Sequence, residues 1–225
     1  MTTRYVIGNW KANKTPKDTL RWLDAFRQEV KKIPIDPHTK VIVCPPYTDV
    51  SVFHETVKKH NLPLILGAQD VSHYEEGSHT GEIPAALLEG LVKYVLIGHS
   101  ERRREQHEKD DQLREKVKQA HAAGLKVVYC VQDVNVYVPR GVEMVAYEPV
   151  WAIGSGRAET PENADRVLGR LKKQTGVKVG IYGGSVVPDN ANAFTAMEHI
   201  DGVLPGGASL KAKTFSQLIQ SASAR

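Results

Sequence analysis

The sequence contains little cysteine: only Cys44 and Cys130 occur in 225 residues. Two cysteines exclude the disulfide framework that holds small secreted domains together. Each ends a short apolar run typical of a strand, KVIVC and KVVYC. We therefore expect both thiols to be buried and reduced, as in a cytosolic protein.

Long apolar runs are also missing. No uninterrupted stretch approaches the length of a membrane span. The N-terminal residues MTTRYVIGNWK lack the apolar centre of a signal peptide. The sequence therefore predicts a soluble, cytoplasmic protein with no membrane partner.

No strong charge of one sign is present. The formal net charge is +4, which suits a small anionic substrate but is too weak and dispersed to indicate nucleic-acid binding. The densest basic run, Arg102–Arg104, lies among acidic residues and is typical of a solvated helix face.

Linkers of domain scale, repeats and low-complexity segments are absent, so we expect residues 1–225 to form a single domain. Short β-branched runs alternate with amphipathic stretches, which predicts parallel strands joined by right-handed helical crossovers. The expected strands are 5–8, 40–44, 64–68, 94–98, 126–130, 143–147, 178–182 and 202–204. The expected helices are 15–32, 49–60, 84–91, 110–123, 160–173, 188–197 and 214–223. Eight such units predict a (β/α)8 barrel of the α/β class.

One crossover is too short for a normal helix. Only residues 131–147 separate Cys130 from Glu148, and the last of them form a strand. We expect a shortened or missing helix after the fifth strand, reduced to a turn or replaced by a local irregularity of the barrel. Such a gap would expose barrel-wall residues such as Val127 and Val145, and we hypothesise that another subunit covers them.

Polar residues and glycines cluster where these strands end, which is the rim that carries active sites in such barrels. The stretch AYEPVWAIGSG at 146–156 places Glu148 at a strand end, followed by apolar residues. An isolated acid there would be a solvated strand tip. Together with the residues that follow the first and fourth strands, it indicates a catalytic base beneath an apolar lid.

Seven segments carry a family resemblance in order along nearly the whole chain. They are GNWKAN (8–13), GAQD (67–70), HTGE (79–82), GHSERR (98–103), AYEPVWAIGSG (146–156), YGGSV (182–186) and GGASLK (206–211). This pattern resembles the triosephosphate isomerase family. The resemblance implies an intramolecular aldose–ketose isomerase of glycolysis and gluconeogenesis. Its substrates would be dihydroxyacetone phosphate and D-glyceraldehyde 3-phosphate, with no metal or organic cofactor.

The resemblance also implies roles for particular residues. Glu148 would be the base that removes the proton, and His99 a neutral electrophile. Lys11 would supply positive charge, Asn9 a hydrogen bond to a substrate oxygen, and Glu101 an acid beside the lysine. The expected phosphate-binding residues are Gly154, Ser185, Gly183, Gly184, Gly206 and Gly207. The expected lid residues are Pro149, Val150, Trp151, Ala152, Ile153 and Ser155.

Several alternatives and departures accompany this resemblance. A different barrel enzyme for phosphorylated substrates would keep the glycine turns but has no reason to keep His99 and Glu148. A non-catalytic barrel would be free to lose Lys11 as well. Asp70 stands where the family usually has Asn, and Cys130 is interpreted as a packing residue. Thr80 lies in a long connection that in the family reaches across a dimer, so we expect a homodimer, with a tetramer possible.

Overall fold

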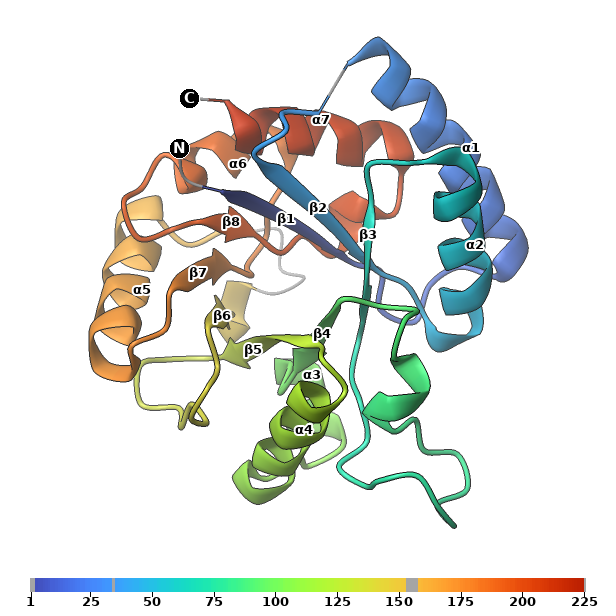
Figure 1. Cartoon of the computed structure of the whole chain (residues 1–225). Coiled ribbons are helices and arrows are strands. Elements are labelled where there is room, and N and C mark those ends of the chain that lie inside the picture. Colours follow the sequence, from blue (N-terminus) through green and yellow to red (C-terminus); the bar gives the residue numbers. More distant parts are fainter. Residues whose placement is uncertain (1–2, 34, 153–157, 225) are drawn as a thin grey trace.

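A computed structural model describes residues 3–33, 35–152 and 158–224 of the chain. Eight parallel strands pair in sequence order and close into a barrel (Figure 1). They are β1 (Arg4–Asn9), β2 (Thr39–Cys44), β3 (Ile65–Ala68), β4 (Tyr94–Ile97), β5 (Lys126–Val131), β6 (Met144–Tyr147), β7 (Val179–Tyr182) and β8 (Gly202–Val203). This architecture confirms the predicted (β/α)8 fold.

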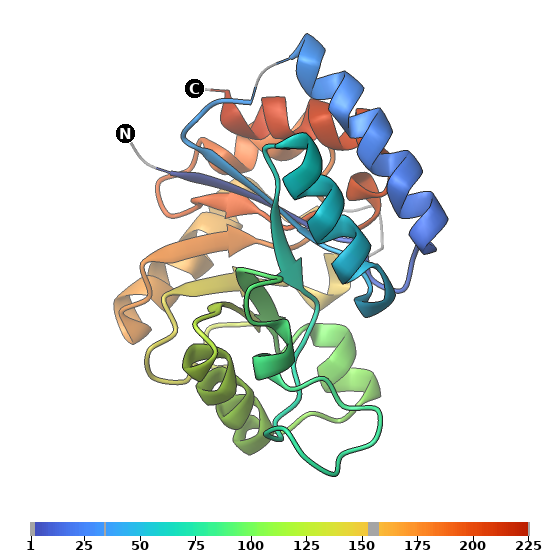
Figure 2. The same ribbon diagram turned by 45° about the vertical axis from the view of Figure 1, so that its right-hand side comes forward.

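Helices surround the barrel. They are α1 (Pro16–Lys32), α2 (Val50–His60), α3 (Ser100–Glu105), α4 (Asp110–Ala122), α5 (Pro161–Thr175), α6 (Pro188–Thr195) and α7 (Ala212–Ser223). Shorter 3-10 turns are η1 (Tyr47–Asp49), η2 (Ala85–Leu88), η3 (Val150–Ala152) and η4 (Gly207–Ser209). Figure 2 shows α1 and α2 side by side on one flank of the barrel.

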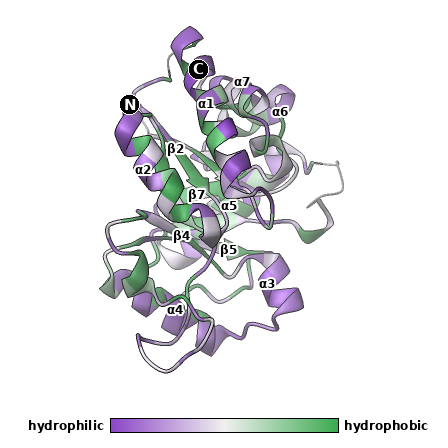
Figure 3. Cartoon of the chain, turned by 90° about the vertical axis from the view of Figure 1, so that its right-hand side faces the viewer, coloured by the Kyte–Doolittle hydropathy of each residue, from purple (hydrophilic) through white to green (hydrophobic). Residues whose placement is uncertain are grey.

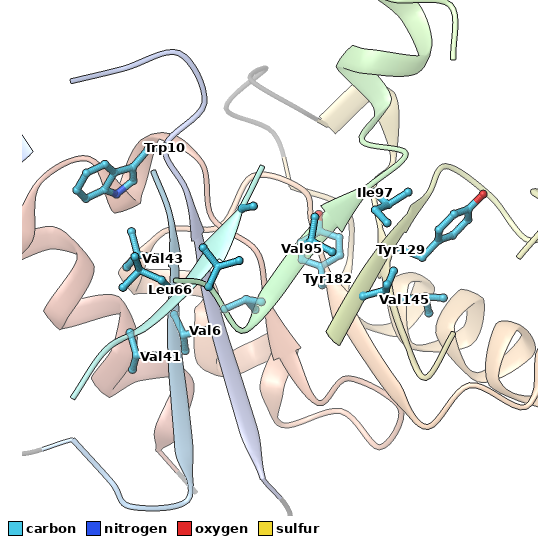
Figure 4. Packing of buried hydrophobic residues seen from close by; sticks show 14 of the residues in the cluster. Val6, Trp10, Val41, Val43, Leu66, Val95, Ile97, Tyr129, Val145 and Tyr182 are labelled. Carbon is cyan, nitrogen blue, oxygen red and sulfur yellow. The ribbon is translucent and has the colours of Figure 1, made fainter. Parts of the chain in front are cut away.

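Alternation along each strand produces two apolar layers. One layer fills the barrel and consists of strand residues such as Ile42, Val128 and Met144, together with Leu204 after β8. The other lies between the barrel wall and the helices, and Figure 4 shows part of it around Val6, Val41 and Val43. Colouring by hydropathy shows the same division, with apolar strands inside and polar outer helix faces (Figure 3).

Local signals in the sequence begin two of the helices. The Thr15 side chain accepts from the Asp18 backbone N–H, and Asp18 reaches back to Thr15, which forms a capping box before Pro16. Thr160 caps α5 through its side chain, with Pro161 as the first helical residue. A hydroxyl cap followed by a proline therefore marks the first turn of both α1 and α5.

No helix lies between β5 and β6, where all of residues 132–143 are described. Instead, Val134, Val136 and Val138 of this connection pack against the core. Val127 is 4% exposed and Val145 is fully buried within the single chain. The expectation that the short crossover exposes Val127 and Val145 is therefore wrong, because the single chain already buries both. Cover of this region by another subunit stays a hypothesis.

Two helix assignments also differ from the prediction. The expected helix at 84–91 is only the 3-10 turn η2, because Glu89 leaves the helical region with ψ 133° and Gly90 follows at φ +76°. Conversely, α3 forms directly after His99, in a segment that carried no apolar periodicity.

Among the described residues, no helix is long and apolar enough to cross a membrane.

Candidate active site

The predicted site residues meet in one cavity at the carboxyl ends of the strands. Its volume is about 420 Å³. The lining includes Asn9, Lys11, His99, Glu148, Gly183, Gly184, Ser185, Gly206 and Gly207. These residues come from segments far apart in the sequence, and the closed parallel barrel brings them to one rim.

Glu148 lies at the end of β6 and is fully buried. It continues the inward-facing series of Met144 and Ala146, so its side chain points toward the mouth of the barrel. Its Oε2 accepts a hydrogen bond of 2.9 Å from the backbone N–H of Ser100. Its Oε1 is buried and has no hydrogen-bond partner among the described residues. The carboxylate is thus held from one side while its other oxygen stays available.

His99 presents one ring nitrogen to this carboxylate. Its Nε2 lies 3.1 Å from Glu148 Oε1, although the orientation does not meet the geometry of a hydrogen bond. Its Nδ1 accepts a hydrogen bond of 3.2 Å from the backbone N–H of Glu101. A nitrogen that accepts carries no proton, so this arrangement favours a neutral imidazole with its proton on Nε2.

Lys11 adopts φ +52°, a left-handed conformation that is unusual for a side chain of this size. Two contacts hold it there: its N–H donates to Asn9 Oδ1 at 3.0 Å, and its carbonyl accepts from Gln69 Nε2 at 2.9 Å. The turn therefore directs both Asn9 and Lys11 into the cavity.

Glu101 fixes the other end of the lysine, with Lys11 Nζ 2.5 Å from Glu101 Oε1. Burial acts to raise the pKa of Glu101, but the hydrogen bond and charge of Lys11 outweigh it and hold that pKa below its usual value. Glu101 therefore stays ionised and keeps the ammonium in place. It does not line the cavity itself, so it acts through Lys11.

Glycines line another part of the cavity. Gly183 follows β7 directly and donates its N–H to the Tyr147 carbonyl at 2.8 Å. A side chain there has no room, because a Cβ on Gly183 would lie 3.0 Å from Glu148 Cγ. Gly206 and Gly207 precede or begin η4, whose backbone turns at the cavity. The Ser185 carbonyl accepts from Asn190 Nδ2 at 3.1 Å, which braces the loop after β7.

The predicted lid is described only in part. Pro149 is buried, and η3 begins with Val150 and Trp151, which are 48% and 59% exposed. Ile153, Gly154 and Ser155 lie outside the described residues. Ala152 ends η3.

Cys130 packs in the barrel interior, as the sequence indicated. The sequence did not indicate a base beside it, yet its buried thiol interacts with the Glu148 carboxylate. Burial, followed by the charge of Glu148, raises the pKa of this thiol well above its usual value. The pairing of Cys130 with Ala146 two residues before Glu148 explains the contact. The register between β5 and β6, which brings Cys130 close to Glu148, is set by the sheet and could not be read from the sequence.

Within the described ranges, no group of three or more His, Cys, Asp or Glu residues is arranged to hold a metal ion. Cys44 and Cys130 are both free and buried, as the sequence predicted.

Known proteins are similar to this chain in both sequence and structure. A sequence model of the family described as triosephosphate isomerase matches residues 4–222. Triosephosphate isomerase of Clostridium botulinum (strain Loch Maree / Type A3) is 37% identical, covering 97% of this chain and 99% of that protein. The Nostoc punctiforme enzyme of the same name is 35% identical over 95% of this chain and 96% of its own length. The crystal structure of triosephosphate isomerase from Bartonella henselae superposes with a TM-score of 0.84 at 29% identity, covering 98% of this chain and 99% of that chain. On this barrel, this rim and these relatives, the chain belongs to the triosephosphate isomerase family, a family of isomerases.

Proposed function

We propose that this chain interconverts dihydroxyacetone phosphate and D-glyceraldehyde 3-phosphate through an enediolate. The observation that carries the proposal is the pairing of Glu148 and His99 in the cavity. A fully buried carboxylate keeps one oxygen without a hydrogen-bond partner, 3.1 Å from a ring nitrogen that carries a proton. A base and a hydrogen-bond donor so placed can act on adjacent atoms of one small substrate.

Glu148 removes a proton from the carbon next to the carbonyl. The electron pair of that C–H bond forms the C=C bond of the enediolate, and the carbonyl oxygen takes up the negative charge. The proton then returns to the neighbouring carbon, which completes the isomerisation. Burial keeps water away from this carboxylate, which supports Glu148 as the base.

The remaining polar groups act on the oxygens. His99 Nε2–H donates to the oxygen that becomes negative, and the neutral ring can pass protons between the two oxygens. Lys11 supplies positive charge near the enediolate and the phosphate, held in place by Glu101. Asn9 uses Oδ1 for the turn at Lys11, which leaves its amino group for a substrate oxygen.

Backbone groups bind the phosphate in this proposal. Gly183, Gly184, Ser185, Gly206 and Gly207 line the same cavity as Glu148 and offer N–H donors without bulky side chains. Gly154 would join them from the segment after η3. Residues 149–155 form the lid, which excludes water over the base and protects the enediolate.

The test is isomerisation of D-glyceraldehyde 3-phosphate by the parent and by Glu148→Gln, with the exposed acid Glu162 changed to Gln as a matched control. Removing the base should lower kcat by about 10²- to 10⁴-fold while the control stays active. An inactive parent, or a Glu148→Gln variant as fast as the parent, would refute the proposal.

We also propose that the protein works as a homodimer in the cytoplasm. Residues 72–82, including Thr80, project from the body beyond α4 (Figures 1 and 2). Tyr74 in this segment is 42% exposed, which suits a partner surface. A tetramer is the second candidate, because the short crossover after β5 resembles the form found in tetrameric members of the family.

A further inference from the structure

Glu159 lies just before α5 and connects three elements of the fold. Its Oε2 accepts a hydrogen bond of 2.8 Å from the Tyr147 hydroxyl, and its Oε1 accepts from Asn163 Nδ2. Its backbone N–H donates to the Tyr182 hydroxyl at 3.0 Å. Both carboxylate oxygens are thus engaged, and the residue bridges β6, β7 and the first turn of α5.

The two tyrosines are direct neighbours in the barrel. Tyr147 ends β6 and Tyr182 ends β7, and their Cα atoms are paired in the register of these strands. Their side chains belong to the layer between the wall and the helices, where Tyr147 is 6% exposed and Tyr182 is fully buried. Figure 4 shows Tyr182 within this layer. Because side chains alternate, the next residue of each strand points toward the cavity.

Those next residues are Glu148 and Gly183, which we place at the base and at the phosphate. The Tyr182 hydroxyl also lies against Gly184, since a Cβ there would be 2.1 Å from it. A shift of either phenol is therefore transmitted along one or two peptide units to the site. No other described residue is shown bonded to both phenols.

We propose that Glu159 is a positioning residue that fixes Glu148 relative to Gly183. Its carboxylate fastens Tyr147 to the first turn of α5, while its backbone N–H holds the Tyr182 hydroxyl. This inference rests on the proposed isomerase function of the same cavity. Glu159 touches no reacting atom and acts only through the tyrosines.

The chemistry of the buried phenols supports this role. Burial raises the pKa of Tyr147, and the hydrogen bond to Glu159 raises it further, so its hydroxyl stays a donor. Burial likewise raises the pKa of Tyr182 to about 12. A buried phenol whose acceptor is removed must rotate toward another acceptor or water, because an unpaired buried hydroxyl is unfavourable.

The experiment measures kcat and KM for Glu159→Ala, Glu159→Gln and the control Glu162→Ala, an exposed acid three residues further along. Glutamine keeps one acceptor oxygen for Tyr147, whereas alanine keeps none. We expect the alanine variant to lose roughly tenfold in kcat, because a misplacement well below 1 Å is enough for such a loss. The glutamine variant should recover most of kcat, and the control should match the parent.

A double-mutant cycle with Tyr147→Phe separates positioning from general damage. If Glu159 acts through Tyr147, the loss in the double variant should equal that of Glu159→Ala alone and should not multiply. Each variant is assayed at a temperature where circular dichroism shows it folded. Multiplying losses, or an alanine variant with the parent's kcat, would overturn the inference. An inactive parent would instead refute the proposed function.

Discussion

Replacing Gly183 by alanine should displace the base and lower kcat without unfolding the barrel. A Cβ at Gly183 would lie 3.0 Å from Glu148 Cγ, 3.3 Å from the Tyr147 carbonyl oxygen and 3.5 Å from Leu204 Cδ2. Ordinary contact begins at 3.4 Å, so Glu148 Cγ or the β7 backbone must move by at least 0.4 Å. The carbonyl belongs to a paired strand, so the side chain of Glu148 is the part free to give way.

The expected loss follows from that displacement. A misplacement of about 1 Å can reduce a rate about 100-fold, so a shift of half that size corresponds to roughly tenfold in kcat. Tenfold is about 1.4 kcal/mol of lost transition-state stabilisation. Overpacking of a buried site typically costs about 1 to 3 kcal/mol of folding free energy, and we expect the lower end because one methyl is added.

Steady-state isomerisation and thermal unfolding of Gly183→Ala measure both quantities. The matched control is Gly169→Ala in α5, where the three atoms nearest to a Cβ all belong to the His199 ring, at 3.1 to 3.2 Å. That ring is 37% exposed and its Nδ1 lies 2.9 Å from Asp165 Oδ2, so a shift of a few tenths of an ångström costs little, and alanine favours the helix by about 1 kcal/mol. The control should therefore keep its activity and its stability. A folded Gly183→Ala variant with kcat within about twofold of the parent would show that Glu148 is not held against Gly183.

Two further predictions concern charge and assembly. Burial raises the pKa of Asp70 to about 6, against the lowering effect of Lys116 and Arg102 at 2.6 and 2.9 Å from its Oδ2. A carboxyl with a raised folded pKa stabilises the fold at low pH and loses that contribution as pH rises through about 6, opposite to the usual aspartate. Urea titrations of the parent and of Asp70→Asn measure this effect as the difference between their free energies of unfolding. The value for the variant minus that for the parent should increase by about 1 to 2 kcal/mol between pH 5 and pH 8. A difference that does not change with pH would contradict the raised pKa. Light scattering of the parent at micromolar concentration should give the mass of a dimer or tetramer, and a monomer would refute the proposed assembly.

Asp70 also shows why a motif alone misses part of a site's surroundings. The sequence marked it only as a departure from the family's usual residue. The structure places it in a charged group with Arg102, Glu108 and Lys116, in which Lys116 Nζ lies 2.6 Å from both acids and only Arg102 is substantially exposed. These residues come from the loop after β3, from α3, from the following loop and from α4, so no spacing along the chain could have joined them.

The failed helix assignments have a similar origin. Residues 84–91 carry Ala85 and Leu88 at helical spacing, yet the backbone turns out of the helix at Glu89, after a single turn. The connection after β5 looked like a gap because it lacks helical periodicity. Its valines at 134, 136 and 138 alternate as in an extended segment. They pack against the core, and that packing surface exists only once the barrel has closed.

The sequence by itself determined the order of the elements, the positions of most strands and the residues at their carboxyl ends. It could do so because alternation, helix caps and turn glycines act over a few residues. Only the tertiary structure decided which distant groups meet: Ser100 N–H at Glu148, Cys130 beside the same carboxylate, and Glu159 between Tyr147 and Tyr182. Those contacts depend on strand register and barrel closure, which are set by the packing of all eight strands together and not by any one segment.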